Sequence, residues 1–504
     1  MKIFTNDDIR TIDRITIERG TPAIELIARA ADAVADEIVA RVPSSRRTVI
    51  FAGPGNNGAD ALATAGRLAA QGFLIDVYLF NIGGDKLTPE CRICRDGLAG
   101  QAGVRLTEVT GTFTLPELDS SYLVVDGLFG TGLSSGLTGG FMNLVQYINE
   151  SGAYVVSIDV PSGMFSDWNR QSINRNIIHA DLTLALQFPR LAFLMKQNAE
   201  LIGEWKVIDI GLDAEAIRHT PTNFQLIEAK NLRNVLKQRP EFCNKSDFGH
   251  TLIVAGSYGM MGAAQFAARG ALRSGVGKIT VRSASWGFEV MQTSVPEALF
   301  SADPNENFVT AIPPARGYNS VAIGPGIGTA EPTLAALEKF LISATDPIVL
   351  DADALNCIAR RRPLLDRIPD RSVITPHTGE FDRLFGKHST DEERLIRAIK
   401  AAEEYNIVII LKGRYTAQIR PDGKVYFNAT ATPALATPGS GDVLTGIIAS
   451  FMAQGYKPEI ASLVAVAVHG LAGEIAAETH GVYGTTASDV ALAVGPAISR
   501  ILGE

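Results

Sequence analysis

Short apolar runs rich in Val, Ile and Leu alternate with longer segments of helical composition along most of the chain. Each run ends in glycine or in polar residues such as Asp, His or Lys. Together with these ends, the runs occupy 47–60, 74–80, 122–132, 154–163, 245–256, 278–282, 321–328, 348–356, 374–382 and 407–416. This alternation predicts parallel sheets with crossover helices, an α/β fold. Ligands of such sheets bind at the carboxyl ends of the strands, so the polar clusters are expected at one edge.

A stretch between two series of strands marks the expected domain junction. Residues 218–240 have no sustained strand pattern and carry several basic side chains. We therefore place the boundary near 220–224, with one domain at 1–220 and a second at 225–504. Each part has its own strands and glycine loops, so each is expected to fold around its own core.

The first forty residues are predicted to form two helices. Thr21 is expected to cap the second helix, with Pro22 at its first position. An apolar stripe follows on that helix at Leu26, Ala30, Val34 and Ile38. We interpret the stripe as core, and a dimer contact through this helix is the alternative.

The segment Thr-Pro-Gly-Ser-Gly-Asp-Val-Leu at 437–444 carries the strongest chemical signal. Gly439, Ser440 and Gly441 have little side-chain bulk, so their N–H groups can turn toward one point. A buried helix is predicted to follow, and the positive end of a helix suits a phosphate group. Asp442 beside such a site has the position of a base in phosphoryl transfer to a hydroxyl.

With the other C-terminal segments, this motif resembles the ribokinase-like domain of ADP- or ATP-dependent NAD(P)H-hydrate dehydratases over about 225–504. The resemblance implies that hydrated NADH or NADPH is phosphorylated on its ring hydroxyl and that phosphate then leaves with a ring proton. Asp442 matches the catalytic base. The implied substrate contacts are Ala263, Gly326, His377 and Asp442, and the implied nucleotide contacts are Lys412, Gly413, Arg414, Tyr415, Thr416, Gly439, Ser440 and Gly441. The co-substrate is ADP or ATP, and magnesium is expected with it.

Simpler interpretations of these polar residues remain open. His377 could hydrogen-bond a neighbouring backbone carbonyl in a turn. Asp351 and Asp353 could cap the helix that begins near Ala354 rather than bind magnesium. Lys412 could be a solvated charge, although a strand end is where an amine that faces phosphate is expected.

In the N-terminal half, Gly53, Gly55 and Gly58 follow a strand and satisfy the Gly-x-Gly-x-x-Gly dinucleotide fingerprint. A plain NAD-dependent dehydrogenase is therefore one interpretation of this half. Two features argue against it. Asp76 lies early in the next strand rather than at its carboxyl end, and the pair Asn56 and Asn57 is unusual in a redox fingerprint.

The segments 56–60, 126–133 and 159–163 together resemble the NAD(P)H-hydrate epimerase domain over about 1–215, a Rossmann-like fold. That family interconverts the two stereoisomers of the hydrate. By resemblance, Asn57, Asp126 and Ser162 are potassium ligands, and oxygen donors suit such a hard cation. Asp159 matches an acid that contacts substrate and is our choice for proton transfer. The implied substrate contacts are Asn56, Asn57, Gly58, Ala59, Asp60, Gly130, Thr131, Gly132, Leu133, Ser134, Ser135, Gly136 and Asp159.

This half departs from the epimerase pattern at several positions. Ala59 and Ala61 stand where the family usually has glycine, and Arg190 stands where it usually has Lys. Residues 26–31 read Leu-Ile-Ala-Arg-Ala-Ala in place of Leu-Met-Glu-x-Ala-Gly. A methyl group at 59 is tolerated in a helix but not at positive φ.

Composition narrows the choice of partners and compartment. The 504 residues are 46 % hydrophobic and carry a net charge of −8, which argues against nucleic acid as a partner. Cys91 and Cys94 are interpreted as reduced thiols on a helix. No secretory signal is seen, and the apolar stretch 460–477 is interpreted as a buried helix too short and too polar to cross a membrane. We expect a cytoplasmic homo-oligomer that acts on small molecules.

The sequence thus favours a bifunctional enzyme that epimerises the hydrated cofactor and then dehydrates its S-form. The alternative from another class is a ribokinase-type small-molecule kinase whose N-terminal domain binds a nucleotide without catalysis. A kinase would leave the phosphate on its product, and a dehydratase would not.

Overall fold

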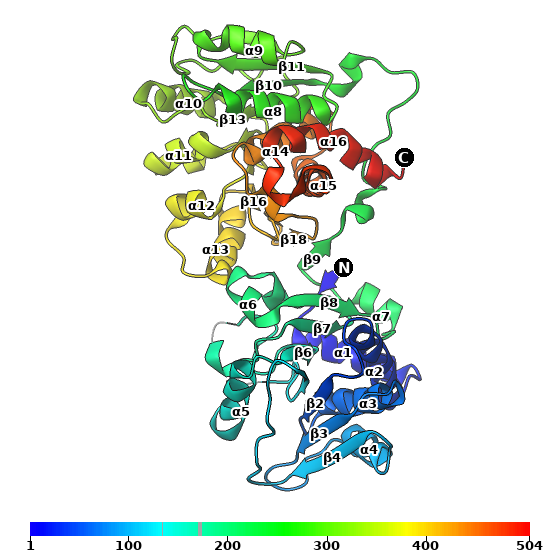
Figure 1. The fold of residues 1–504 in the computed structure, drawn as a ribbon. Coiled ribbons are helices and arrows are strands. Elements are labelled where there is room, and N and C mark those ends of the chain that lie inside the picture. The colour runs from blue at the N-terminus through cyan, green and yellow to red at the C-terminus, as the bar shows by residue number, and fades with distance from the viewer. Residues whose placement is uncertain (134, 170–173) are drawn as a thin grey trace. The chain divides into compact units, whose positions relative to one another are not determined.

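A computed structural model describes residues 1–133, 135–169 and 174–504 of the protein. The chain divides into two compact units, Met1–Thr222 and Asn223–Glu504, called unit 1 and unit 2 below (Figure 1). Ser134 lies outside the described residues, so its expected contact with substrate cannot be placed.

Unit 1 holds a parallel sheet in the strand order β4-β3-β2-β5-β6-β7-β8. The strands of this unit are β1 (Lys2–Ile3), β2 (Arg47–Ala52), β3 (Ile75–Phe80), β4 (Val104–Val109), β5 (Tyr122–Gly127), β6 (Tyr154–Ile158), β7 (Leu182–Leu186) and β8 (Glu204–Ile208). Its α-helices are α1 (Asn6–Glu18), α2 (Ala23–Val39), α3 (Asn56–Ala70), α4 (Pro89–Leu98), α5 (Gly139–Glu150), α6 (Ala199–Ile202) and α7 (Ala214–His219). The strand order reverses between β2 and β5, and the crevice at such a switch point is where α/β sheets bind ligands.

The helices of unit 1 cover both faces of its sheet. Helices α1 to α4 and α7 share one apolar cluster with the sheet, whereas α5 packs in a separate cluster on β2, β5 and β6. The stripe Leu26, Ala30, Val34 and Ile38 lies within the first cluster, so it is core, as interpreted, and not a free dimer surface. This doubly wound arrangement confirms the predicted Rossmann-like fold of the N-terminal half.

The predicted cap of α2 is wrong. The helix begins at Ala23, and the N-cap position belongs to Pro22, which has no side-chain hydrogen bond to offer. Thr21 therefore lies outside the helix. The fixed φ of proline still orients the entering chain, so the helix starts one residue later than predicted without a polar cap.

Unit 2 contains a larger, mostly parallel sheet whose strands follow the order β9-β18-β17-β16-β15-β14-β13-β10-β11-β12. Only β17 runs antiparallel to its two neighbours. The strands are β9 (Phe224–Ile227), β10 (His250–Val254), β11 (Lys278–Ser283), β12 (Leu299–Ala302), β13 (Ser320–Ile323), β14 (Val349–Leu350), β15 (Val373–Ile374), β16 (Val408–Leu411), β17 (Ala417–Ile419) and β18 (Val425–Asn428). The order reverses between β10 and β13, where Ile253 pairs with Ala322.

The helices of unit 2 lie on both sides of this sheet (Figure 1). They are α8 (Met261–Arg273), α9 (Phe288–Ser294), α10 (Glu331–Ser343), α11 (Ala352–Arg360), α12 (Thr378–Phe385), α13 (Asp391–Glu404), α14 (Ser440–Ala453), α15 (Pro458–Gly484) and α16 (Ala487–Leu502). Helices α8, α14, α15 and α16 form one large apolar cluster with the sheet. The predicted α/β fold class is confirmed in both units.

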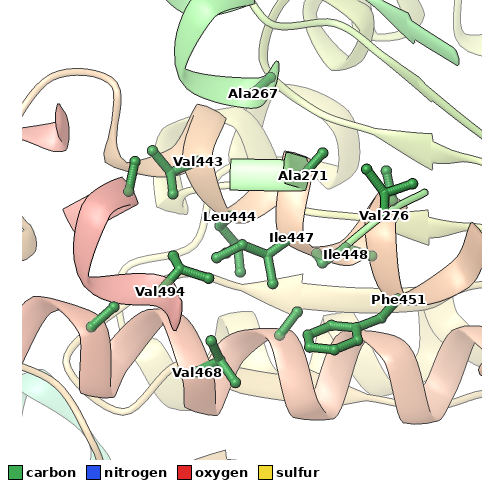
Figure 2. Packing of buried hydrophobic residues seen from close by; sticks show 14 of the residues in the cluster. Ala267, Ala271, Val276, Val443, Leu444, Ile447, Ile448, Phe451, Val468 and Val494 are labelled. Atoms are coloured by element: carbon green, nitrogen blue, oxygen red, sulfur yellow. The ribbon is translucent and has the colours of Figure 1, made fainter. Parts of the chain in front are cut away.

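Glycines bring α8 and α14 unusually close together. A Cβ on Gly446 would overlap the carbonyl oxygen of Ala267, and a Cβ on Gly270 would overlap that of Val443. Around these positions, Ala267 and Ala271 of α8 pack against the aliphatic side chains of α14 (Figure 2). The close packing fixes the start of α14, which carries the predicted catalytic segment.

Helix α15 is longer than the sequence analysis expected. It extends over 27 residues, with a kink at Gly481 where the backbone is not helical, and its length and composition would allow it to cross a membrane, so the expectation that it is too short is wrong. However, 72 % of its most apolar window is buried inside the protein. Its apolar residues form the core of unit 2, as interpreted from the sequence.

Candidate active sites

The site of unit 1 is a cavity of about 580 Å³ at the carboxyl edge of the sheet. Loops after β2 and β5, the residue after β6, and helices α1 and α2 form its wall. The predicted contacts that line it are Asn56, Asn57, Asp60, Gly130, Thr131, Gly132, Leu133, Ser135 and Asp159. The structure thus brings together three segments that are far apart in sequence, at the switch point between β2 and β5.

Three other predicted contacts do not line this cavity. Gly58 and Ala59 are buried in the first turn of α3, and Gly136 is exposed. Gly58 has a structural role because a Cβ there would overlap the carbonyl oxygen of Gly53. Ala59 and Ala61 are helical and fully buried, so their methyl groups cause no backbone strain. These two departures from the family pattern leave the cavity open.

Asp159 is held tightly on both of its carboxylate oxygens. The Nη2 atom of Arg190 pairs with Oδ1 at 2.5 Å, and the backbone N–H of Thr131 donates to Oδ2 at 3.2 Å. Asp159 has a φ of +68°, a left-handed conformation that non-glycine residues adopt at a cost of about 1–3 kcal/mol. Strain of this kind clusters at functional sites, and here it fixes a carboxylate at the cavity wall.

Arg190 keeps unused hydrogen-bonding capacity beside the cavity. Its side chain is only 2 % exposed, yet its Nε and Nη1 groups have no hydrogen-bond partner among the described residues. Leaving a buried charged donor unpaired is expensive. The N–H groups of these two nitrogens therefore fit a ligand with acceptor oxygens.

The three expected potassium ligands lie at the same edge. Ser162 donates through its hydroxyl to Asp126 at 2.6 Å and through its backbone N–H at 2.9 Å. The Asn57 amide is buried, and neither its oxygen nor its nitrogen has a partner among the described residues. Burial raises the pKa of Asp126, against the lowering effect of the serine hydrogen bonds. A buried carboxylate with an unpaired amide oxygen is a donor set that fits a hard cation.

Asp76 does not support the dehydrogenase interpretation. It is the second residue of β3, it pairs with the exposed Arg105 at 2.7 Å, and it is absent from the residues that line the cavity. Cys91 and Cys94 are free thiols on α4, as interpreted. Burial raises their pKa to about 12 and about 11, so both remain protonated and unreactive at neutral pH.

Sequence reasoning missed Asp13, which lines the cavity from α1. Its carboxyl group forms no hydrogen bond with the residues that the structure describes. Burial raises the pKa of Asp13 to about 6. The nearby Arg190 acts to lower this pKa, and Asp159 acts to raise it. The signal in the sequence was a charged residue between Ile9 and Ile17, at helical spacing on an otherwise apolar face.

The site of unit 2 is centred on Asp442 in the first turn of α14. Burial raises the pKa of Asp442 to about 7, Asp351 adds to the rise, and Lys412 opposes it. A carboxylate with a pKa near the working pH is well matched to general base catalysis. The structure thus gives the predicted base an environment suited to that role.

Lys412 is an anchored charge and not a solvated one. Its Nζ pairs with Asp351 at 2.9 Å, and the hydroxyl of Thr445 donates to the other oxygen of Asp351 at 2.7 Å. Burial alone lowers the pKa of Lys412, but Asp351 and Glu380 raise it more, so the amine stays charged. The cation therefore stands beside the start of α14.

The glycine segment before α14 forms an open helix N-terminus. Gly439 adopts a left-handed conformation at φ +90°, and a Cβ there would overlap the Phe266 ring. A Cβ on Gly441 would lie 3.2 Å from Lys412 Nζ, so a side chain there would crowd the amine. Backbone N–H groups in the first turn have no partner within the helix and can bind an anion.

Ser440 points away from this anion site. Its hydroxyl lies 3.0 Å from Nε2 of His469, and its carbonyl oxygen lies 2.9 Å from the same atom. Burial lowers the pKa of His469 to about 4, so the ring is neutral. His469 lies within the stretch 460–477, which was interpreted from the sequence as a buried helix. Its contact with Ser440, 29 positions earlier, could not be read from the sequence.

The predicted substrate contacts of unit 2 other than Asp442 occupy different elements. A Cβ on Gly326 would lie 2.9 Å from that of Ala263, so these two residues adjoin at the switch point between β10 and β13. His377 is the N-cap of α12, where its Nδ1 accepts from the N–H groups of Gly379 and Glu380. The alternative in which His377 bonds a backbone carbonyl is thus wrong. The ring accepts backbone hydrogen bonds instead.

Neither Asp351 nor Asp353 caps its helix with a side chain. Asp351 is the N-cap residue of α11, but its carboxylate is used by Lys412 and Thr445. Asp353 accepts from the backbone N–H of Gly328 at 2.9 Å. The capping alternative is therefore wrong for both. The remaining nucleotide contacts lie in the turn after β16, where the Thr416 hydroxyl donates to the Gly413 carbonyl and Arg414 stacks on Tyr415.

Comparison with known proteins divides the chain in the same way. Residues 23–192 match the family described as YjeF-related protein N-terminus, and residues 251–494 match the family described as NAD(P)H-hydrate dehydratase. A ribokinase-like protein of Enterococcus faecalis superposes with a TM-score of 0.50 at 23 % identity, over 56 % of this chain and 99 % of that chain. This likeness shows the ribokinase-like fold that was predicted.

Full-length relatives carry both parts. The chain is 33 % identical to a bifunctional NAD(P)H-hydrate repair enzyme of Moorella thermoacetica, over 97 % of this chain and 95 % of that protein. It is 32 % identical to the enzyme of the same description from Thermofilum pendens, over 96 % of this chain and 94 % of that protein. These matches confirm the resemblance drawn from the motifs. The chain belongs to the family of bifunctional NAD(P)H-hydrate repair enzymes.

Proposed function

We propose that unit 1 interconverts the R- and S-forms of hydrated NADH or NADPH and that unit 2 dehydrates the S-form at the expense of a nucleotide. The observation that carries the dehydratase assignment is the buried Asp442, with a pKa of about 7, at an open helix N-terminus beside Lys412. Membership of the repair family supports both activities.

The geometry of unit 2 accounts for phosphoryl transfer. Asp442 takes the proton of the ring hydroxyl as the hydroxyl oxygen bonds to the terminal phosphorus of the nucleotide. The bond from that phosphorus to the bridging oxygen breaks, and the N-terminus of α14 and Lys412 stabilise the charge. Phosphate then leaves the ring carbon while a proton leaves the neighbouring carbon, which restores the double bond of NADH or NADPH.

Magnesium fits this site as part of the nucleotide complex. No group of three His, Cys, Asp or Glu side chains among the described residues could hold a metal ion by itself. Magnesium is usually bound by one or two carboxylates together with substrate phosphates. Asp351 and Asp353 supply carboxylates near Asp442, so they are the proposed protein ligands. When bound, the ion would offset the negative charge of the phosphates.

In unit 1, the substrate would occupy the cavity beside Asp159. Arg190 orients Asp159 and offers its unpaired N–H groups to the ligand, while the loop residues Gly130 to Leu133, which line the cavity, would contact the dinucleotide phosphates. Potassium is proposed at Asn57, Asp126 and Ser162, where it would neutralise the buried carboxylate. Asp159, which the sequence suggested for proton transfer, is proposed here as a substrate-contacting carboxylate that Arg190 holds at the cavity wall.

The product of the nucleotide reaction separates this function from a small-molecule kinase. The full chain is incubated with S-form hydrated NADH and either ADP or ATP, and the products are separated and identified. We expect NADH and inorganic phosphate in equal amounts. A stable phosphorylated dinucleotide would instead show a kinase. The same assay decides between ADP and ATP.

A further inference from the structure

One face of α1 supplies a titratable group to the cavity of unit 1. Ile9, Asp13 and Ile17 are spaced four residues apart, and all three line the cavity. Ile12 and Thr16, on another face of the same helix, are buried in the core. Packing of that face therefore fixes the helix rotation that directs Asp13 to the cavity.

The charged groups around Asp13 come from several elements. Arg190 lowers the pKa of Asp13 and Asp159 raises it, while Asp13 in turn raises the pKa of Asp60 on α3. Arg10 of α1 also lines the cavity. Asp60 is buried, and this burial raises its pKa well above the ordinary value. The pKa of Asp13 is about 6, so this carboxyl group can both give and take a proton near neutral pH.

Both carboxylate oxygens of Asp159 are already occupied. Arg190 holds one of them, and the backbone N–H of Thr131 donates to the other. No hydrogen bond ties the Asp13 carboxyl to other residues within the described parts of the chain. Arg190 also keeps two buried N–H groups without a described partner on this cavity, which points to a polar ligand there. The two carboxyl groups thus differ in their freedom to react.

We infer that Asp13 is the general acid and base that moves the hydroxyl of the hydrated ring during epimerisation, while Asp159 serves as a fixed anion. This inference rests on the proposed epimerase function of unit 1. It adds a catalytic residue from α1 to a site otherwise built from the loops at the carboxyl edge of the sheet.

The chemistry of the substrate explains why an acid is needed. Hydration of an enamine places the hydroxyl on the carbon bonded to the ring nitrogen. Asp13 donates its proton to this hydroxyl, the carbon–oxygen bond breaks, and water leaves as the nitrogen lone pair forms a carbon–nitrogen double bond. The Asp159 carboxylate stabilises the cationic ring. Water then adds to the opposite face of that carbon and returns a proton to Asp13, so atoms and charge balance without another reactant.

The test compares Asp13→Asn with wild type in the full chain. R-form hydrate is supplied with saturating nucleotide, so the dehydratase of unit 2 reports each epimerisation as NADH. Direct dehydration of S-form hydrate by the same preparation is the internal control, and Asp36→Asn, an exposed residue of α2, is the matched variant. Spontaneous epimerisation is measured without protein and subtracted.

We expect Asp13→Asn to lose about 10²–10⁴-fold in kcat from R-form hydrate, with a much smaller change in KM. Dehydration of S-form hydrate should be unchanged, and Asp36→Asn should match wild type. Because the acid must be protonated, wild-type epimerisation should fall as pH rises through about 6, and this limb should vanish in Asp13→Asn. Asp13→Glu should keep the limb and recover at least tenfold over Asp13→Asn.

Two results would overturn the assignment. One is epimerisation by Asp13→Asn within threefold of wild type, and the other is a low rate in Asp13→Glu with no pH limb, which indicates a structural role only. Failure of wild type itself to convert R-form hydrate, with S-form dehydration intact, would instead remove the proposed function of unit 1. Hydrogen exchange of α1 in the Asn variant verifies that the helix remains folded.

Discussion

Asp159 of unit 1 and Asp442 of unit 2 stand in similar places, each in a site at the carboxyl edge of a parallel sheet, but their surroundings differ. Asp159 has a strained backbone, and Arg190 and a backbone N–H occupy its oxygens. Asp442 lies unstrained in the first turn of a helix, and the nearest cation, Lys412, is already paired with Asp351. One carboxylate is held in place through both of its oxygens, and the other has a pKa of about 7, close to the working pH.

The comparison shows how partners assign roles to identical side chains. A cation placed directly on a carboxylate favours its charged form, whereas burial without a direct cation raises its pKa. In unit 1 the exchangeable proton is therefore expected elsewhere, on Asp13. In unit 2 it is expected on Asp442 itself. The following predictions test this difference, beginning with the largest effect.

Asp442→Asn should abolish most of the dehydratase activity and spare unit 1. The amide keeps the shape of the side chain but cannot accept the hydroxyl proton, so kcat should fall about 10²–10⁴-fold. Nucleotide binding, measured by calorimetry, should persist because the backbone N–H groups of 439–441 remain. Turnover above half of the wild-type value would show that Asp442 is not the base.

Arg190→Ala should destabilise unit 1 strongly. Removal of one partner of a buried ion pair leaves an unpaired charge and typically costs about 3–5 kcal/mol, and this pair is 2 % and 10 % exposed. Hydrogen exchange in β6 and β7 should accelerate accordingly, while α14 in unit 2 serves as the internal reference. Combining Arg190→Ala with Asp159→Asn should restore part of the protection. If the double variant exchanges as fast as Arg190→Ala alone, charge pairing is not the cause.

Potassium should stabilise unit 1 through a site that unit 2 does not share. Binding to the folded state at 10–100 times the dissociation constant adds about 1.4–2.7 kcal/mol. We expect slower exchange of β5 and β6 in potassium chloride than in choline chloride of equal ionic strength, with no change in unit 2. Asp126→Asn should remove the difference. Equal exchange of the wild type in the two salts would contradict the proposed ligands.

The dehydratase reaction should depend on pH through Asp442. The base must be ionised, and burial has raised its pKa to about 7, so kcat/KM should decline about tenfold for each unit below that value. Between pH 8 and pH 6 the expected loss is about tenfold. Asp351→Asn removes a negative neighbour and should move the midpoint to lower pH. A profile flat from pH 8 to pH 5 would place the limiting proton transfer elsewhere.

The sequence predicted the fold and most of the residues around the two sites, because these features depend on short, contiguous segments of the chain. Strands ending in glycine or Asp indicate a parallel sheet, and Gly439 to Asp442 follow each other directly in the chain. The cap of α2 was misplaced because Thr21 and Pro22 both fit a helix start in composition. Periodicity alone does not choose between adjacent capping residues.

Contacts between distant segments could not be predicted in this way. Lys412 and Asp351 are 61 positions apart, and Asp159 and Arg190 are 31 apart. Whether such side chains meet depends on strand order and helix rotation, which a single sequence does not fix. Asp13 was overlooked for the same reason, since only the packing of α1 on unit 1 directs it to the cavity.

The most direct test of the account is one time course of NADH formation from pure R-form hydrate by the full chain, with the preferred nucleotide and potassium. If both sites act in sequence, all of the hydrate is converted to NADH, faster than spontaneous epimerisation allows. The rate should drop toward the spontaneous value in Asp13→Asn and by about 10²–10⁴-fold in Asp442→Asn. Conversion by the wild type no faster than spontaneous epimerisation, or accumulation of a phosphorylated hydrate, would contradict the account.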